Sequence, residues 1–135
     1  MPEAVVIGAG PGGLAAAAML RRVGVADTLI LERSEWVGAS WHKHYDRLHL
    51  HTVRWLSNLP GRRIPRSFGK WVGRDDVIRY LEDYARHHRL DIRHGVQVQR
   101  IVRSGEQWLL ETSVGEIPAT FVVVATGHNH TPRIP

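Results

Sequence analysis

The segment Gly8-Ala9-Gly10-Pro11-Gly12-Gly13 constrains the fold of this chain more than any other part of its sequence. It directly follows the apolar run Ala4–Ile7 and opens an alanine-rich stretch, as a turn between a first strand and a first helix does. A second apolar run, Leu29–Leu31, is closed by Glu32. This order of strand, glycine-rich turn, helix, strand and terminal acid predicts a βαβ unit that binds a dinucleotide, with a purely structural βαβ unit as the alternative.

The glycines and the acid have distinct predicted roles. Gly8 permits the tight turn off the strand, Gly10 lets a pyrophosphate approach the backbone, and Gly13 lets the helix pack on the sheet. The pyrophosphate is expected on free N–H groups at the helix N-terminus, where the helix dipole favours negative charge. Glu32 is placed to accept hydrogen bonds from a ribose diol.

Length and composition limit the class of protein. The 135 residues are 43% hydrophobic, enough to form the core of one domain spanning residues 1–135. No apolar run reaches the length of a membrane span and no signal sequence precedes the first strand, so we expect a cytoplasmic chain without a membrane partner. The sequence has no cysteine, which excludes disulfides, thiolate metal sites and electron transfer through a cysteine pair within this chain.

The charge balance is basic, with a formal net charge of +5 and a pI of about 10.4. All the basic residues except Lys43 and Lys70 are arginines, which suit bidentate binding of phosphate or carboxylate. They are dispersed along the chain and no nucleic-acid recognition motif accompanies them. We therefore expect an anionic cofactor rather than a nucleic acid as the partner.

Hydrophobic periodicity predicts strands at about 4–7 and 28–32 and a helix from about Gly12 to Val23. Residues 33–73 are irregular but rich in tryptophan and histidine, which favours a segment that wraps a ligand. A second helix is predicted to begin at Arg74, with Asp75 or Asp76 near its N-cap.

The last third of the chain predicts a β-meander and a return strand. Strand-like stretches lie near 96–103, 107–112 and 120–125. The continuously apolar run 121–124 is typical of a parallel strand covered on both faces. The predicted fold class is α/β, a Rossmann-like parallel sheet with a β-meander inserted before its last strand.

Three motifs in the sequence resemble the flavin-dependent monooxygenases that use FAD and NADPH, among them the plant auxin-forming and Baeyer–Villiger enzymes. The glycine-rich turn, including Pro11, together with Glu32 matches the FAD fingerprint of that family. Gly38-Ala39-Ser40-Trp41 is similar to its Gly-Gly-x-Trp stretch beside the flavin, with Ala39 in place of the second glycine. Ala125-Thr126-Gly127, followed by Pro132 and Pro135, resembles its Ala-Thr-Gly motif on the strand that returns to the FAD.

This resemblance implies FAD as the cofactor of a Rossmann-like FAD-binding domain. The cofactor-binding residues that it implies are Gly8, Gly10, Pro11, Gly12, Gly13, Glu32, Arg33, Trp41, Ala125, Thr126 and Gly127. Family members continue into a second GxGxxG motif for NADPH and a C-terminal segment that completes the FAD domain. These 135 residues contain neither, so the domain is expected to be truncated relative to the family.

We accordingly expect the FAD-binding portion of an NADPH-dependent flavin monooxygenase, inactive alone, which self-associates or is stabilised by a complementary polypeptide. One alternative is a non-catalytic nucleotide-binding or structural fragment. The other is an NAD-dependent dehydrogenase domain, against which Glu32 and Ala125-Thr126-Gly127 argue.

No side chain stands out as a general acid or base. By the resemblance, His51 occupies the place of an asparagine that supports the flavin in many family members; Asn58 is a second candidate, and a solvent-exposed loop histidine is the alternative. Three His-x-His pairs, beginning at positions 42, 49 and 128, suggest metal ligands. Only Asp46 among acidic residues lies at a suitable spacing, so we expect no metal site.

Overall fold

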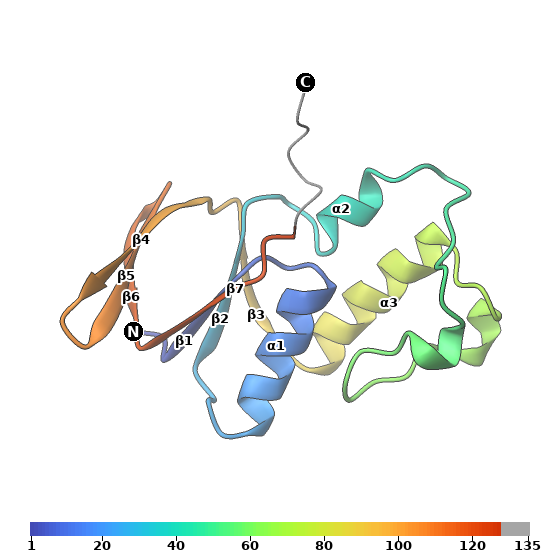
Figure 1. Ribbon diagram of the computed structural model, residues 1–135, viewed down its shortest axis with the longest axis horizontal. Helices are drawn as coiled ribbons and strands as arrows, with labels where there is room; N and C mark the ends of the chain where they lie inside the picture. Colours follow the sequence, from blue (N-terminus) through green and yellow to red (C-terminus); the bar gives the residue numbers. More distant parts are fainter. Residues whose placement is uncertain (128–135) are drawn as a thin grey trace.

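The computed structural model describes residues 1–127 of the chain (Figure 1). Its helices and strands follow one another in the order β1 (Ala4–Ile7), α1 (Pro11–Arg22), β2 (Thr28–Glu32), α2 (Ala39–His42), α3 (Arg74–His87), β3 (Asp91–His94), β4 (Val98–Ser104), β5 (Gln107–Thr112), β6 (Gly115–Ala119) and β7 (Phe121–Val124). Two short 3₁₀ turns, Arg54–Leu56 and Arg66–Phe68, interrupt the segment between α2 and α3. The first two predicted strands are confirmed with their predicted bounds.

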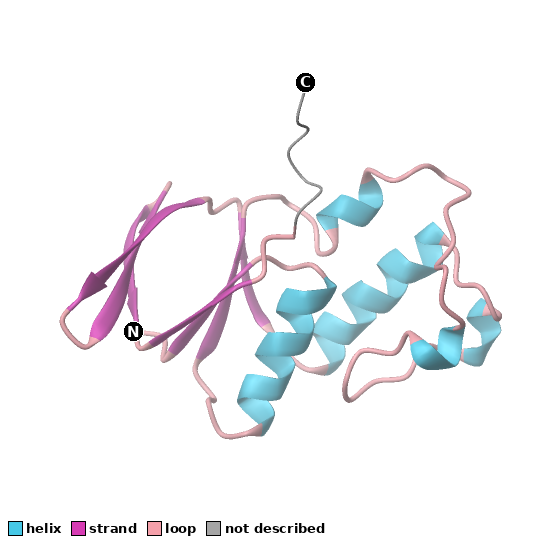
Figure 2. Ribbon diagram, in the orientation of Figure 1, coloured by secondary structure: helices cyan, strands magenta, loops and turns pink. Residues whose placement is uncertain are grey.

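The strands form two sheets. β3, β2, β1 and β7 lie side by side in that order and are parallel throughout. β4, β5 and β6 form an antiparallel meander. The helices α1 and α3 lie on one side of the parallel sheet and the meander on the other (Figures 1 and 2). The predicted α/β class, with a meander inserted before the last parallel strand, is confirmed.

Alternating side chains of β1 face the two outer layers. Val6 packs with Leu14 and Tyr84 in the cluster beneath the helices, whereas Val5 and Ile7 pack with residues of the meander. All four residues of β1 are buried. Burial on both faces explains why the strand reads as a continuous apolar run rather than an alternating one.

Two strands, β3 and β6, were not among the sequence predictions. In β3 only Ile92 is both apolar and half-buried, because the strand lies at the edge of the sheet. β6 contains Pro118, which cannot donate a ladder hydrogen bond and is tolerated because β6 is the outer strand of the meander. Because both strands lie at sheet edges, neither has the apolar sequence pattern from which a strand is usually predicted.

The predicted start of the second helix at Arg74 is confirmed, but the expected N-cap is wrong. Gly73 is the N-cap of α3, and no side chain caps it. Asp75 and Asp76 lie in the first helical turn instead. There their carboxylates favourably oppose the positive end of the helix dipole.

The run 121–124 packs on both faces at its centre, as expected, but β7 is an edge strand and the ends of the run are exposed. Val122 packs against the meander cluster and Val123 against the helix cluster. The end residues are open, with Phe121 50% and Val124 63% exposed. The structure thus leaves apolar surface along the outer side of β7.

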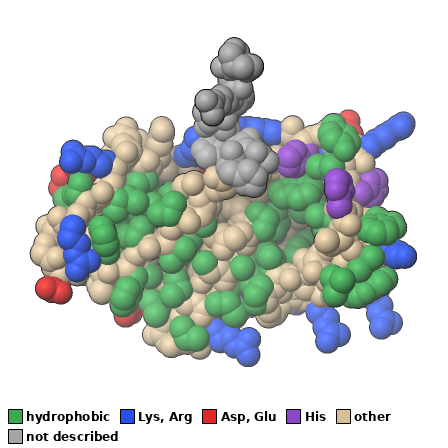
Figure 3. All heavy atoms as spheres, viewed as in Figure 1, with side chains coloured by type: hydrophobic (Ala, Val, Ile, Leu, Met, Phe, Trp, Pro, Cys, Tyr) green, Lys and Arg blue, Asp and Glu red, His purple; other side chains and the backbone are tan. Residues whose placement is uncertain are grey.

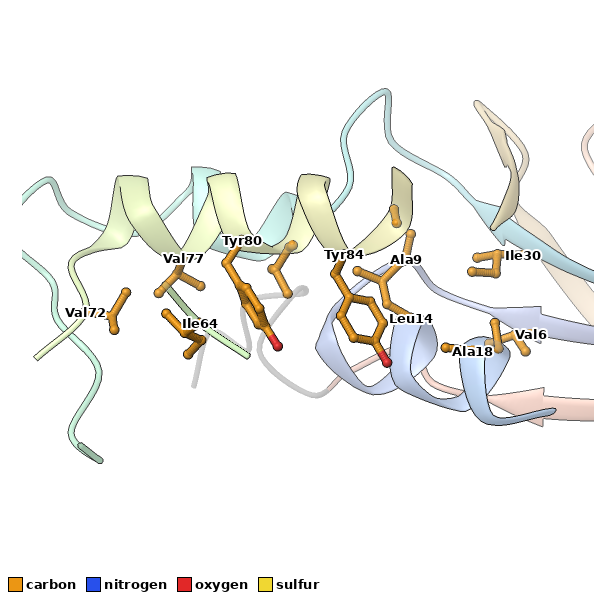
Figure 4. Packing of buried hydrophobic residues seen from close by; sticks show 13 residues of the cluster. Val6, Ala9, Leu14, Ala18, Ile30, Ile64, Val72, Val77, Tyr80 and Tyr84 are labelled. Atoms are coloured by element: carbon orange, nitrogen blue, oxygen red, sulfur yellow. The ribbon is translucent and has the colours of Figure 1, made fainter. Parts of the chain in front are cut away.

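Tyrosines of α3 hold the long segment between α2 and α3 in place. Tyr80 accepts a hydrogen bond from the Leu59 N–H at 2.8 Å and donates one to the Arg62 carbonyl at 2.6 Å. Tyr84 donates to the Pro60 carbonyl, and burial raises its pKa to about 12. Figure 4 shows both rings pointing from α3 into the core. Across residues 1–127, no helix has the length and apolarity that crossing a bilayer requires.

Candidate functional site

A cleft of about 490 Å³ lies at the carboxyl ends of β1, β2 and β7. Its lining residues are Gly8, Gly10, Pro11, Gly12, Glu32, Arg33, Ser34, Ala39, Ser40, Lys43, His44, Ala125, Thr126 and Gly127. β1 lies between β2 and β7, so the chain departs from β1 toward one side of the sheet and returns on the other. Ligands of open α/β sheets bind at such reversals of strand order.

Two glycines of the turn are required by packing inside the protein. Gly8 has a φ of +110°, and a Cβ built on it would lie 2.3 Å from the Ala125 carbonyl oxygen. A Cβ on Gly13 would lie 1.8 Å from the Gly8 carbonyl oxygen. Gly8 therefore lets the turn meet the end of β7, and Gly13 lets α1 approach that same turn.

The other two glycines of the turn have a different environment. A Cβ at Gly10 or Gly12 would meet no atom within 4 Å, although both residues line the cleft. Gly10 is the N-cap of α1 and no side chain caps this helix, which leaves the first N–H groups of the helix available. Space without a protein occupant, next to free N–H groups and the positive end of a helix, fits a pyrophosphate.

Glu32 connects the end of β2 to the glycine-rich turn. Its buried carboxylate accepts hydrogen bonds from the Ala9 N–H at 2.8 Å and from the Ser34 N–H at 3.0 Å. Each carboxylate oxygen has a second lone pair, so the group can still accept two hydroxyl donors from the cleft. The sequence did not indicate that this side chain also supports the turn.

We expect Glu32→Ala to weaken FAD binding by roughly tenfold to a hundredfold. Charge-assisted hydrogen bonds to a ribose diol contribute on the order of 1.5–3 kcal/mol, which corresponds to that loss. Titration followed by flavin fluorescence quenching measures it, and thermal melts of the free chain measure the separate cost of losing the Ala9 contact.

Glu35→Ala is the matched control, because Glu35 lies three positions further on, is exposed and does not line the cleft. It is expected to leave FAD affinity unchanged. FMN, which lacks the adenosine ribose, should bind the unmodified chain more weakly than FAD. Equal affinities for FMN and FAD would contradict the ribose role of Glu32.

Four of the expected cofactor or flavin-facing residues do not line the cleft: Gly13, which packs α1 against the turn, and Trp41, His51 and Asn58. Trp41 lies on the opposite side of α2, in an edge-to-face contact with His44 whose ring centroids are 5.0 Å apart. His51 is exposed and lines a separate depression with Arg47 and Lys70. Asn58, the other candidate, accepts a hydrogen bond from the Ile64 N–H at 2.7 Å within its own loop.

The turn into α2 supplies cleft residues that the sequence analysis did not select. Gly38 adopts a left-handed φ of +65° and donates its N–H to the Ala9 carbonyl at 2.9 Å. This contact places α2 beside the glycine-rich turn. The lining residues that were not expected are Ser34, Lys43 and His44, whereas Ala39 and Ser40 belong to the stretch that the resemblance placed beside the flavin. Lys43 and His44 lie within three positions of Trp41, which was the available signal.

Metal ligands do not gather in the described part of the chain. Within residues 1–127, no three side chains of the His, Cys, Asp or Glu types lie together in a way that could hold a metal ion. The third His-x-His pair, His128 and His130, lies outside the described residues, as do Pro132 and Pro135.

Comparisons with known proteins identify relatives of this chain. Residues 5–135 match the family described as pyridine nucleotide-disulphide oxidoreductase. The chain is 38% identical over 139 residues to the indole-3-pyruvate monooxygenase YUCCA1 of rice (Oryza sativa subsp. japonica), covering 100% of this chain and 34% of that protein.

Among solved structures, a flavin-containing monooxygenase from Stenotrophomonas maltophilia matches with a TM-score of 0.86 and 32% identity, over 97% of this chain and 41% of that one. The bacillithiol disulfide reductase Bdr of Staphylococcus aureus also matches with a TM-score of 0.86, at 23% identity over 93% of this chain and 38% of that chain. At this identity the match shows a shared fold alone. The chain spans about a third of the length of the rice relative.

Proposed function

The chain belongs to the pyridine nucleotide-disulphide oxidoreductase family and corresponds to the N-terminal part of flavin monooxygenases, and from this we propose that its cleft binds FAD. The observation that carries the proposal is the open space at Gly10 and Gly12, at the uncapped start of α1. Gly10, Gly12 and Glu32 line the same cleft, so one ligand can present its pyrophosphate to the start of α1 and its ribose to Glu32.

Within this proposal each part of the cleft has a physical task. The N–H groups at the start of α1 hold the pyrophosphate, and Glu32 accepts the hydroxyls of the adenosine ribose. Arg33 and Lys43, which line the cleft, offset the phosphate charge. Ala125 and Gly127 present backbone without bulk at the end of β7, where the cofactor passes close to the sheet.

Bound FAD supplies the redox chemistry of the proposed oxidoreductase, since it accepts hydride and its reduced form reacts with dioxygen. The protein's part is to bind, orient and exclude water. The absence of cysteine from these 135 residues means that this chain offers no thiol pair to receive electrons from a flavin. This favours monooxygenation over disulfide reduction as the activity of the intact architecture.

The direct test is a titration of the purified chain with FAD. We expect saturable quenching of flavin fluorescence and a shifted absorption spectrum, with FAD bound more tightly than NAD. A folded chain that binds neither nucleotide would support the alternative of a structural fragment. A preference for NAD would support the dehydrogenase alternative.

We expect the FAD-loaded chain to oxidise NADPH no faster than free FAD does. Hydride transfer needs the nicotinamide held about 3–3.5 Å from the flavin, and loss of that positioning removes most of the rate enhancement. The 135 residues contain a single glycine-rich strand-to-helix turn, which FAD is proposed to occupy. Absorbance at 340 nm measures the rate, and sustained NADPH-dependent oxygenation of an amine, sulfide or ketone would overturn the expectation.

We further propose that the chain self-associates or is stabilised by a complementary polypeptide. Support comes from β7, whose outer edge and half-exposed Phe121 and Val124 leave backbone groups and apolar surface available. Figure 3 shows hydrophobic side chains over one broad face of the molecule. Light scattering at increasing concentration is expected to show growth in mean mass, and Val124→Lys should reduce it. A monomer at every concentration would contradict the self-association.

A further inference from the structure

Helix α2 supplies part of the wall of the proposed FAD cleft, yet it is too short to be stable on its own. At its start, the Gly38 N–H bonds to the Ala9 carbonyl at 2.9 Å. Beyond its last residue, Lys43 and His44 also line the cleft. The position of these two residues therefore depends on contacts from outside α2.

Arg74, the first residue of α3, makes the contact that holds this end of α2. Its Nη1 donates to the His44 carbonyl at 2.8 Å and to Asp46 Oδ1 at 3.2 Å. Its Nε donates to Asp75 Oδ1 at 3.1 Å. Figure 1 shows α2 alongside α3, and the two helices are in contact. One guanidinium thus joins the chain beyond α2 to the first turn of α3.

The bond to the His44 carbonyl is the contact of Arg74 that we expect to matter most. The Arg74 side chain is only 20% exposed, and its backbone N–H is fixed by the Leu48 carbonyl at 2.8 Å. Asp46 and Asp75 are 96% and 70% exposed, so water weakens both ion pairs. A backbone carbonyl cannot move away as an exposed carboxylate can, and a charged donor bonds to it more strongly than a neutral one.

We propose that Arg74 is a positioning residue for FAD, which fixes the backbone at residues 43–44 so that Lys43 is ordered in the cleft before the cofactor arrives. The inference rests on the proposed function and adds to it a residue that sets affinity from outside the cleft. Arg74 does not line the cleft, so it acts on a ligand through the residues that it holds. A group that is already ordered loses less conformational entropy on binding, which raises affinity.

Arg74→Met is expected to weaken FAD binding by roughly threefold to tenfold, the cost of ordering residues that the parent chain already holds in place. Arg79→Met is the matched control and should leave FAD affinity unchanged. Arg79 lies in the same helix and is 70% exposed, and its ion pair with Asp76, at 2.9 Å, stays within α3. Both substitutions remove one positive charge, so the comparison separates the position of the arginine from the net charge.

A double-mutant cycle with Lys43→Met distinguishes positioning from a general loss of stability. Lys43→Met should weaken FAD binding in the parent chain, and by a factor about twofold smaller in the Arg74→Met chain, because Lys43 is no longer held there. Independent effects, in which the two losses of affinity simply multiply, would overturn the proposal.

Hydrogen exchange of the free chain gives a readout that does not depend on FAD. The Lys43 and His44 amides are bonded to carbonyls of α2. Arg74→Met should raise their exchange rates roughly tenfold relative to Arg79→Met, since a charge-assisted hydrogen bond no longer opposes local opening. Unchanged rates would overturn the proposal. Faster exchange in a chain that fails to bind FAD would instead remove the proposed function and leave the hold of Arg74 on the cleft intact, so the two failures are distinguishable.

Arg74→Lys provides a second variant should Arg74→Met not fold. An ammonium group keeps the charge but lacks the planar fork of a guanidinium, so it cannot reproduce the three contacts of Arg74 together. It should lower FAD affinity by roughly twofold or more. A folded Arg74→Lys chain with the FAD affinity and the amide exchange rates of the parent would overturn the proposal.

Discussion

Gly10→Val is expected to abolish FAD binding and to leave the chain folded. A Cβ at Gly10 meets no protein atom within 4 Å and its φ of −83° suits any residue, so the substitution costs the free protein little. The same side chain would stand in the cleft at the N-cap of α1, where the pyrophosphate is proposed to lie. Loss of that close approach removes the backbone contacts on which phosphate binding at a helix N-terminus depends.

Fluorescence titration with FAD and a thermal melt followed by circular dichroism separate the two parts of this expectation. Gly105→Val is a control for general tolerance, because Gly105 lies in the β4–β5 turn, has nothing within 4 Å of an added Cβ and does not line the cleft. Its φ of +62° makes it the more strained substitution of the two. If the Gly10 variant folds and retains full FAD affinity, the turn is not the pyrophosphate site.

Gly13→Ala is expected to have the opposite effect and to destabilise the fold severely, by more than about 3 kcal/mol. The added Cβ would lie 1.8 Å from the Gly8 carbonyl oxygen, and neither atom belongs to a side chain that can rotate away. Relief requires α1 to move off β1, which would open the cluster around Val6 and Leu14.

Chemical denaturation measures this loss through the midpoint at constant slope. Gly12→Ala is the matched control, since Gly12 is its helical neighbour, is exposed and has open space where the Cβ would go. That variant should be as stable as the parent chain or slightly more so, because alanine favours a helix over glycine. A Gly13→Ala chain with the stability of the Gly12→Ala chain would show that α1 does not pack as closely as described.

The parts of the fold that the sequence predicted are those where local pattern and burial agree. β1 and β2 are buried on both faces, so every residue in Ala4–Ile7 and in Thr28–Leu31 could be read as strand without a competing pattern. The strands that were missed, β3 and β6, lie at sheet edges, where polar residues and Pro118 are tolerated. Edge position depends on tertiary arrangement, which the residues of a short segment do not encode by themselves.

The site was predictable where the chemistry depends on backbone shape. Glycines at a strand-to-helix turn predict a close approach of backbone and ligand, and the structure brings Gly8, Gly10 and Gly127 together in one cleft. The direction in which a side chain leaves a short helix is not visible there. Trp41 and Lys43 are two positions apart, yet Lys43 lines the cleft and Trp41 lies on the opposite side of α2.

The contact between Gly8 and Ala125 has a consequence for the order in which this protein acquires its cleft. The two residues come from opposite ends of the described chain, and β1 meets β7 only after everything between them has been made. Pairings so distant in sequence close late and slowly during folding. During synthesis on the ribosome the glycine-rich turn emerges before β7. The residues that follow β7 and complete the lining of the cleft emerge later. A nascent chain should therefore become able to retain a nucleotide only after β7 has been made and has paired with β1.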